Sequence, residues 1–137
     1  MTFAIRPAEY YYANVRDELG AAYRVLSQLA ERGVNLLAFT AVPAGPSLAQ
    51  FALFPETPAK LVEEARAAGL SLDGPHRALL VQGDDELGAF ASVHERLLKV
   101  GVDIYASSGA IDGRGSFGYV MYVREDQFER AVEALGL

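Results

Sequence analysis

An internal repeat is the feature that most constrains how this 137-residue chain can fold. When Asp17 is placed on Asp85, segment 17–36 aligns with segment 85–104 without a gap, and nine of the twenty positions are identical. Five of the identities are consecutive, because Asp-Glu-Leu-Gly-Ala occurs at 17–21 and again at 85–89. The other identities fall on one helical face or on a Gly-Val pair, as expected for a duplicated structural unit.

Each copy predicts the same succession of elements. A β-rich run precedes the repeated acidic segment, a helix with one apolar face follows it, and two more strands and a second helix complete the copy. Gly-, Pro- and Ser-rich segments at 43–47 and 107–116 are predicted hairpin loops. The predicted strands are 10–15, 34–39 and 48–54, then 77–82, 102–106 and 117–123; the second helices are 57–68 and 125–135.

Residues at the helix ends carry their own signals. Asp17 and Asp85 are predicted N-caps, and the Thr-Pro pair at 57–58 predicts an N-cap followed by proline in the first turn. Gly33 and Gly101 follow their helices and are predicted to adopt the left-handed conformation. The order β-α-β-β-α, found twice, is that of the ferredoxin-like or split-βαβ arrangement.

The fourth strands of the two copies are uneven. Segment 70–73 can serve the first copy, whereas the second copy ends at Gly136-Leu137 with no residues left to pair. The segment Thr2-Phe3-Ala4-Ile5 is the candidate to cross over and fill that edge. The predicted domains are 1–73, with an N-terminal extension over 1–9, and 74–137.

With these motifs in place, the chain resembles the ACT domain family, and in particular small stand-alone tandem ACT proteins, from about Tyr10 onward. The residues that carry the resemblance are Asp17-Glu18-Leu19-Gly20 with Gly33-Val34-Asn35-Leu36, and Asp85-Glu86-Leu87-Gly88 with Gly101-Val102-Asp103-Ile104. Leu19 and Leu87 stand where the family often has proline. The resemblance implies an α+β fold of two ferredoxin-like βαββαβ ACT modules packed side by side, with antiparallel sheets and helices on one face.

The resemblance also implies a regulatory protein that binds a small molecule, often an amino acid, and is not an enzyme. A helix start offers N–H groups to a carboxylate, and acidic side chains beside it suit an ammonium group. Helix capping and close helix–sheet packing explain the same loops without any ligand, so both interpretations stay open. The candidate ligand-binding residues are Asp17, Glu18, Leu19, Gly20, Ala21, Asn35, Leu36, Asp85, Glu86, Leu87, Gly88, Ala89, Asp103 and Ile104.

Composition narrows the other function classes. The chain has no cysteine, which excludes disulfides, thiol nucleophiles and cysteine metal sites, and its two histidines stand apart. We therefore expect no metal and no cofactor. A formal net charge of −6 without a basic cluster argues against nucleic acid and anionic lipid as partners. No apolar run is long enough to span a membrane, and the start lacks a signal peptide, so we expect a cytoplasmic protein.

Two glycine- and aromatic-rich patterns need alternative interpretations. Segment 113–120 matches both the kinase phosphate-loop pattern and the dinucleotide-binding pattern. The 17 residues after Val120 are too few for a kinase catalytic loop, and a predicted strand follows where the dinucleotide-binding pattern requires a helix. Segment 117–122 resembles the aromatic RNA-stacking motif of RRM domains, although Phe117, Tyr119 and Met121 equally suit a sheet surface or a dimer contact. An RRM-like nucleic-acid-binding module and an enzyme on a ferredoxin-like scaffold remain the alternative functions.

Three smaller expectations concern aromatic residues and assembly. Tyr10, Tyr11 and Tyr12 should alternate between the faces of a strand, and one ring could line a pocket near Asp17. His94 is expected to be a partly buried helix residue. An incomplete sheet edge predicts a homodimer, formed through paired edges or through strand 117–123.

Overall fold

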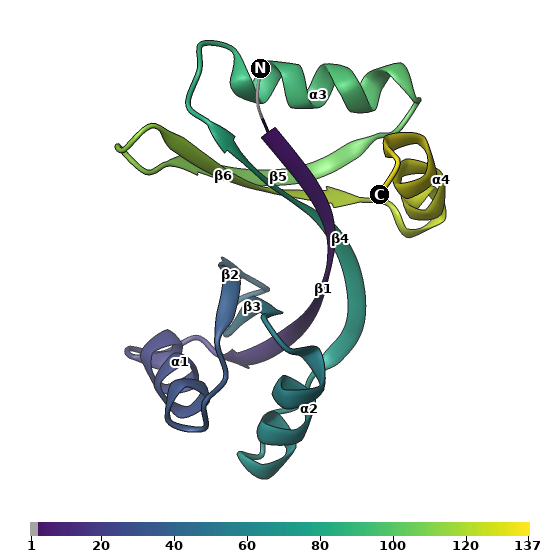
Figure 1. Cartoon of the computed structure of the whole chain (residues 1–137). Coiled ribbons are helices and arrows are strands. Elements are labelled where there is room, and N and C mark those ends of the chain that lie inside the picture. The colour runs from purple at the N-terminus through teal and green to yellow at the C-terminus, as the bar shows by residue number, and fades with distance from the viewer. Residues whose placement is uncertain (1–2) are drawn as a thin grey trace. The chain divides into compact units, whose positions relative to one another are not determined.

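The protein is described by a computed structural model that covers residues 3–137 (Figure 1). Six strands and four helices occur within this range. They are β1 (Phe3–Arg16), α1 (Ala21–Glu31), β2 (Leu36–Pro43), β3 (Leu48–Pro55), α2 (Pro58–Ala67), β4 (Asp73–Asp84), α3 (Ala89–Lys99), β5 (Ile104–Ile111), β6 (Ser116–Val123) and α4 (Glu125–Leu135).

The chain divides into two compact units. The first unit is Glu9–His76, and the second unit is Arg77–Leu137 together with residues 3–8. These units differ from the predicted domains, because the start of the chain belongs with the second repeat and residues 74–76 belong with the first. Of the segment expected to cross over, residues 3–5 lie in the second unit, while Thr2 lies outside the described residues.

Each unit has the strand order of a ferredoxin-like βαββαβ fold. The first unit has the order β2-β3-β1-β4, in which the start of β4 supplies the fourth strand. The second unit has the order β5-β6-β4-β1, in which the start of β1 supplies the fourth strand. The neighbouring pairs β2–β3, β3–β1, β4–β6 and β6–β5 are antiparallel. The predicted α+β fold class is confirmed.

The repeat extends to the details of strand pairing. Ala41 pairs with Phe51 in the first unit, and Gly109 pairs with Tyr119 in the second, at positions that the repeat alignment also matches. Both edge strands also carry an irregularity near their start, between Leu36 and Ala38 and at the equivalent place in β5. Residues matched by the repeat are therefore structurally equivalent, which allows the two units to be compared position by position.

In the first unit both helices cover one face of the sheet. α1 contributes Val25 and Leu29 to the core, and α2 contributes Leu61 and Ala65. The strands meet them with Tyr11, Ala13, Phe51 and Leu53, which alternate along β1 and β3 with residues of the opposite face. Tyr10 lies on that opposite face, where its ring stacks on Phe54 with centroids 4.8 Å apart. The predicted alternation of the three tyrosines is therefore confirmed.

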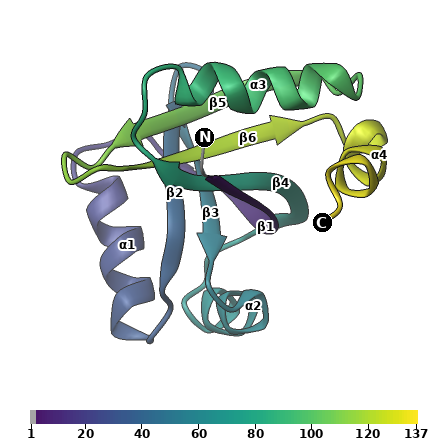
Figure 2. The same ribbon diagram turned by 45° about the horizontal axis from the view of Figure 1, so that its top comes forward.

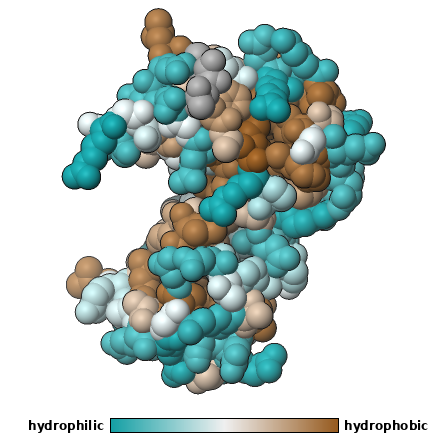
Figure 3. Space-filling view, viewed as in Figure 1, coloured by the Kyte–Doolittle hydropathy of each residue, from teal (hydrophilic) through white to brown (hydrophobic). Residues whose placement is uncertain are grey.

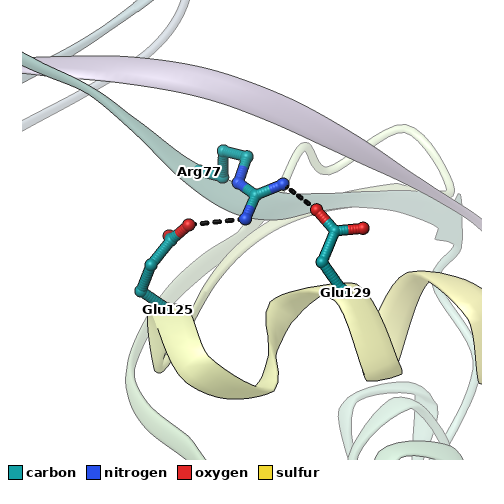
Figure 4. A network of polar contacts seen from close by, with 3 residues as sticks. All are labelled: Arg77, Glu125 and Glu129. Carbon is teal, nitrogen blue, oxygen red and sulfur yellow. Dashed lines mark hydrogen bonds and ion pairs between the residues drawn. The ribbon is translucent and has the colours of Figure 1, made fainter.

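The second unit is built in the same way, and Figure 2 shows α3 running alongside β5 and β6. Val93 and Leu97 of α3 and Phe128 of α4 are buried with strand residues, and Ile5 of β1 joins this core. Arg77 at the start of the unit bonds to Glu129 and Glu125 of α4 (Figure 4) and lies over the Phe128 ring. These carboxylates raise the pKa of the Arg77 guanidinium.

The helices end as the sequence predicts. Gly33 has a φ of 78°, and Val34 donates to the carbonyl of Leu29 while Gly33 donates to that of Ala30. This pair of bonds is the Schellman motif, and Gly101 forms the same motif after α3. α2 begins after Thr57 with proline in its first turn, as predicted.

Three local predictions are wrong. The helix N-caps are Gly20 and Gly88, not Asp17 and Asp85, so α1 and α3 begin after the whole acidic segment. Residues 107–111, predicted as loop, belong to β5, because pairing with β6 outweighs the low strand propensity of serine and glycine. Residues 70–72 precede β4 and do not form a strand.

Candidate functional site

The loop between β1 and α1 presents an open helix start. Gly20 adopts the left-handed conformation with φ 82° and ψ 5°, and no side chain among residues 3–137 caps the helix. The N–H of Ala21 is taken by the carbonyl of Glu18, at 3.1 Å. The N–H groups of Ala22 and Tyr23 also belong to the first turn, where a helix supplies no acceptor. These donors are available to a bound anion.

A cavity of about 600 Å³ lies at this helix start. Phe51 of β3 is buried and contributes an aromatic wall, while the end of β2 and the acidic loop contribute the others. Its volume falls within the roughly 300–1,000 Å³ that small-molecule sites occupy. The lining residues are Asp17, Glu18, Leu19, Gly20, Ala21, Ala22, Tyr23, Ala41, Val42, Pro43, Ala49 and Phe51.

Hydrophobic residues reach the surface in the same region. Figure 3 shows brown, hydrophobic residues among hydrophilic ones where α1, β2 and β3 lie. Tyr23 is 75% exposed and Val42 is 44% exposed, and both line the cavity. The cavity is therefore open to solvent and has a partly apolar rim.

The two acidic side chains of the loop have different surroundings. Glu18 forms an ion pair with Arg24, at 2.8 Å, and Arg24 also donates to the carbonyl of Leu19. The backbone N–H of Asp17 donates to the carbonyl of Ser47, at 2.9 Å, which holds the loop against the β2–β3 turn. Within residues 3–137 no cation neutralises the Asp17 carboxylate. Asp17 can therefore accept an ammonium group at the cavity.

The second unit has a much smaller cavity at the equivalent loop. Its volume is about 170 Å³, which is below the usual range of ligand sites. Leu87, a predicted site residue, does not line it and is fully exposed. The lining residues are Asp85, Glu86, Gly88, Ala89, Phe90, Ala91 and Ile111.

The strand starts predicted to join the loops do not do so within either unit. Asn35 and Leu36 follow the C-terminal end of α1, whereas the acidic loop precedes its N-terminal end. The 11-residue helix separates them by about 16 Å. The Asn35 amide donates to Glu56, at 2.7 Å, and therefore serves the junction between β3 and α2.

The corresponding residues of the second unit, Asp103 and Ile104, also follow their helix and do not join the acidic loop. Asp103 accepts a hydrogen bond from Arg124, at 3.3 Å, and its backbone N–H donates to Gln127. Ile104 begins β5 and does not line the cavity. Asp103 ties the start of β5 to the start of α4.

The cavity-lining residues that sequence reasoning missed come from the first turn of α1, with Ala22 and Tyr23, and from β2 and β3. Ala41, Val42 and Pro43 lie at the end of β2, and Ala49 and Phe51 lie in β3. Because β2 runs back along α1, its end and not its start reaches the acidic loop. Small residues at 22 and 49 were a usable signal, since their repeat partners are Phe90 and Phe117.

The aromatic alternatives are settled by burial. Phe117 and Met121 are buried against α3 and Tyr119 packs on Phe90 of that helix, so β6 offers these rings neither to RNA nor to a dimer partner. β6 also lies between β4 and β5, which leaves it no free edge. His94 is partly buried in α3, as predicted, and bonds to the Tyr119 hydroxyl at 2.7 Å.

Other predicted features do not reach the cavity. None of the three tyrosines at 10–12 lines it. The glycine-rich segment 113–120 begins in the β5–β6 hairpin turn and continues into β6, which starts at Ser116. Among residues 3–137 no group of three or more His, Asp or Glu side chains is arranged to hold a metal ion. The described helices are too short or too polar to cross a membrane.

Comparison with solved structures shows which proteins share this fold. Protein BT0572 from Bacteroides thetaiotaomicron matches with a TM-score of 0.80 and 16% identity, over 96% of this chain and 88% of that one. The regulatory subunit of aspartate kinase from Thermus thermophilus, in ligand-free form, matches with a TM-score of 0.65 and 17% identity, over 98% of this chain and 94% of that one. The regulatory subunit of aspartate kinase from Thermus flavus matches with a TM-score of 0.62 and 16% identity, over 99% of this chain and 95% of that one. No protein-family model and no curated protein matches the chain.

Proposed function

We propose that this chain is a non-catalytic regulatory protein of the ACT type, which binds an amino acid in the cavity of its first unit. The observation that carries the proposal is the open, uncapped start of α1 at a cavity of about 600 Å³. The fold supports it, since two of the structures that share it are regulatory subunits of aspartate kinase. The ACT motifs at both loops support it as well.

The two ends of an amino acid match two features of the cavity. A carboxylate can accept hydrogen bonds from the N–H groups of Ala22 and Tyr23, where the helix dipole also favours negative charge. An ammonium group can be held by Asp17, whose carboxylate is free of ion pairs within residues 3–137. The side chain would then lie against the apolar wall formed by Phe51 and Ala49.

A ligand screen followed by one matched pair of variants tests this function. An amino acid that binds the native state raises the melting temperature, so we expect at least one of the twenty to do so. Asp17→Asn should weaken its binding about fivefold, because about 1 kcal/mol is lost when a charged acceptor becomes neutral. Asp85→Asn, the same change in the second unit, should leave calorimetric affinity unchanged.

The result that contradicts the function is equally plain. If none of the twenty amino acids shifts the melting temperature or gives heat in calorimetry, the cavity does not serve amino-acid sensing. If Asp85→Asn weakens binding as much as Asp17→Asn, the site is not confined to the first unit.

Assembly and location remain proposals of the same kind. We propose a cytoplasmic protein that forms homodimers. An incomplete sheet is not the reason for pairing, because β1 supplies the fourth strand of the second unit. β2 and β5 are still edge strands of their units, and paired edges are a common solution for such strands.

A further inference from the structure

The two equivalent cavities differ because different side chains stand at equivalent positions. Ala22 of α1 corresponds to Phe90 of α3, and Ala49 of β3 corresponds to Phe117 of β6. The backbone frame around them is the same, since elements and strand registers repeat at matched positions of the two copies. The larger side chains at these two positions go with the smaller cavity, about 170 Å³ in the second unit against about 600 Å³ in the first.

The Phe90 ring occupies the space that is empty in the first unit. It packs against Tyr119 with centroids 4.7 Å apart and against Phe117 at 5.2 Å. A Cβ added at Gly109 would come within 3.1 Å of the Phe90 ring, so the ring lies directly over this part of β5. The equivalent residues in the first unit, Ala41 and Phe51, both line the open cavity.

The Tyr119 ring under Phe90 is held in place by polar contacts. Its hydroxyl bonds to His94 at 2.7 Å and donates to Ser107 at 2.9 Å. Phe51, the equivalent residue in the first unit, is buried, and its ring packs against that of Phe39 with centroids 5.3 Å apart. An aromatic residue thus lies beneath the site in both units, and in the second unit Phe90 stands where the first unit has Ala22.

We propose that the first-unit cavity takes an amino acid with an aromatic side chain, whose ring takes the place beside Ala41 that the Phe90 ring takes beside Gly109 in the second unit. This inference rests on the proposed function and adds the class of ligand to it. The second unit shows how such a ring fits between the first helix and the hairpin of the fold. It also follows that the chain binds one such ligand, because Phe90 closes the second site.

Calorimetry with three probes tests the class of ligand. L-phenylalanine should bind with a stoichiometry of one per chain. L-alanine, which lacks the ring, and 3-phenylpropionate, which lacks the ammonium group, should each bind at least tenfold more weakly. Equal affinity for L-alanine and L-phenylalanine would overturn the aromatic assignment.

Variants that copy the second unit into the first test the location. Ala22→Phe combined with Ala41→Gly should reduce the affinity for L-phenylalanine at least tenfold. Ala49→Phe, which copies Phe117 alone, should also reduce it and serves if the double variant does not fold. Ala30→Phe adds the same ring to an exposed position of α1 outside the cavity and should change nothing.

The failures of the two proposals can be told apart. If a polar amino acid binds in the screen and L-phenylalanine does not, the aromatic class is wrong while amino-acid binding stands. If L-phenylalanine binds both folded variants as it binds the unaltered chain, the ring does not lie in this cavity. If no amino acid binds at all, both proposals fail.

Discussion

At the scale of single residues, the repeated Asp-Glu-Leu-Gly motif is explained by its glycine. Gly20 and Gly88 have φ values of 82° and 78°, a conformation that residues with a Cβ rarely adopt. The glycine turns the chain sharply into the helix, which leaves the preceding acidic residues outside the helix and at the mouth of the loop. The motif therefore shapes the loop through its glycine, and its acidic side chains do not cap the helix.

Gly20→Val should destabilise the protein, because a β-branched residue is strained at this φ. We expect the free energy of unfolding to fall by about 1–2 kcal/mol in urea denaturation. Gly20→Asn, which tolerates the left-handed conformation better, should lose less. Equal stability of all three proteins would show that the turn is not required. Because the valine variant alters folding, loss of binding in it says nothing about the ligand.

At the scale of elements, each unit packs a helix over a hairpin. The hairpin register is the same in both units, but the side chains between helix and hairpin differ. These side chains constrain β5, since Gly109 lies under the rings of Tyr119 and Phe90. The first unit has Ala41 at this position and Ala22 at the position of Phe90. The glycine-rich stretch that looks like a loop in the sequence is therefore a strand adapted to a filled site.

Gly109→Ala should destabilise the second unit. The added Cβ would lie 2.7 Å from Tyr119 Cδ1, so ring or strand must shift, at a cost of about 1–3 kcal/mol. Gly118→Ala on the neighbouring strand is the matched control, because its Cβ would meet no atom within 4 Å. Chemical denaturation of both variants checks the difference. If the two are equally stable, the close contact at Gly109 does not constrain the packing.

At the scale of the whole chain, each unit takes its fourth strand from a strand that continues into the other unit. β1 begins in the second unit and ends in the first, and β4 begins in the first unit and ends in the second. Ile5 is 9% exposed and belongs to the core of the second unit, with Phe3 packed against it. A cut between residues 73 and 74 would therefore leave both halves incomplete.

Ile5→Ala should weaken the second unit, although the residue lies at the start of the chain. Loss of a buried side chain of this size costs about 2–5 kcal/mol. Hydrogen exchange should accelerate more in residues 77–137 than in residues 9–76. Arg6→Ala, an exposed neighbour, should leave both regions unchanged. Faster exchange confined to the first unit would contradict the assignment of residues 3–8.

The fold was predictable because its signals are local and occur twice. Helical periodicity, the glycines at 33 and 101 and the Thr-Pro pair at 57–58 each depend on a few consecutive residues, and the second copy supports the interpretation of the first. The acidic loop could be recognised as a candidate site for the same reason. The N-cap was mistaken because aspartate and glycine both favour that position, and only backbone geometry distinguishes them.

By itself the sequence determined the repeat, the order of the elements and the place where each helix ends, since neighbouring residues encode these features. Tertiary structure alone decided which site is open. Whether space remains beside the acidic loop depends on side-chain volumes at 22 and 49, which come from α1 and β3 and meet only after the hairpin packs under α1. The same holds for residues 3–5, whose partners lie in the other half of the sequence and are fixed by burial in a shared core.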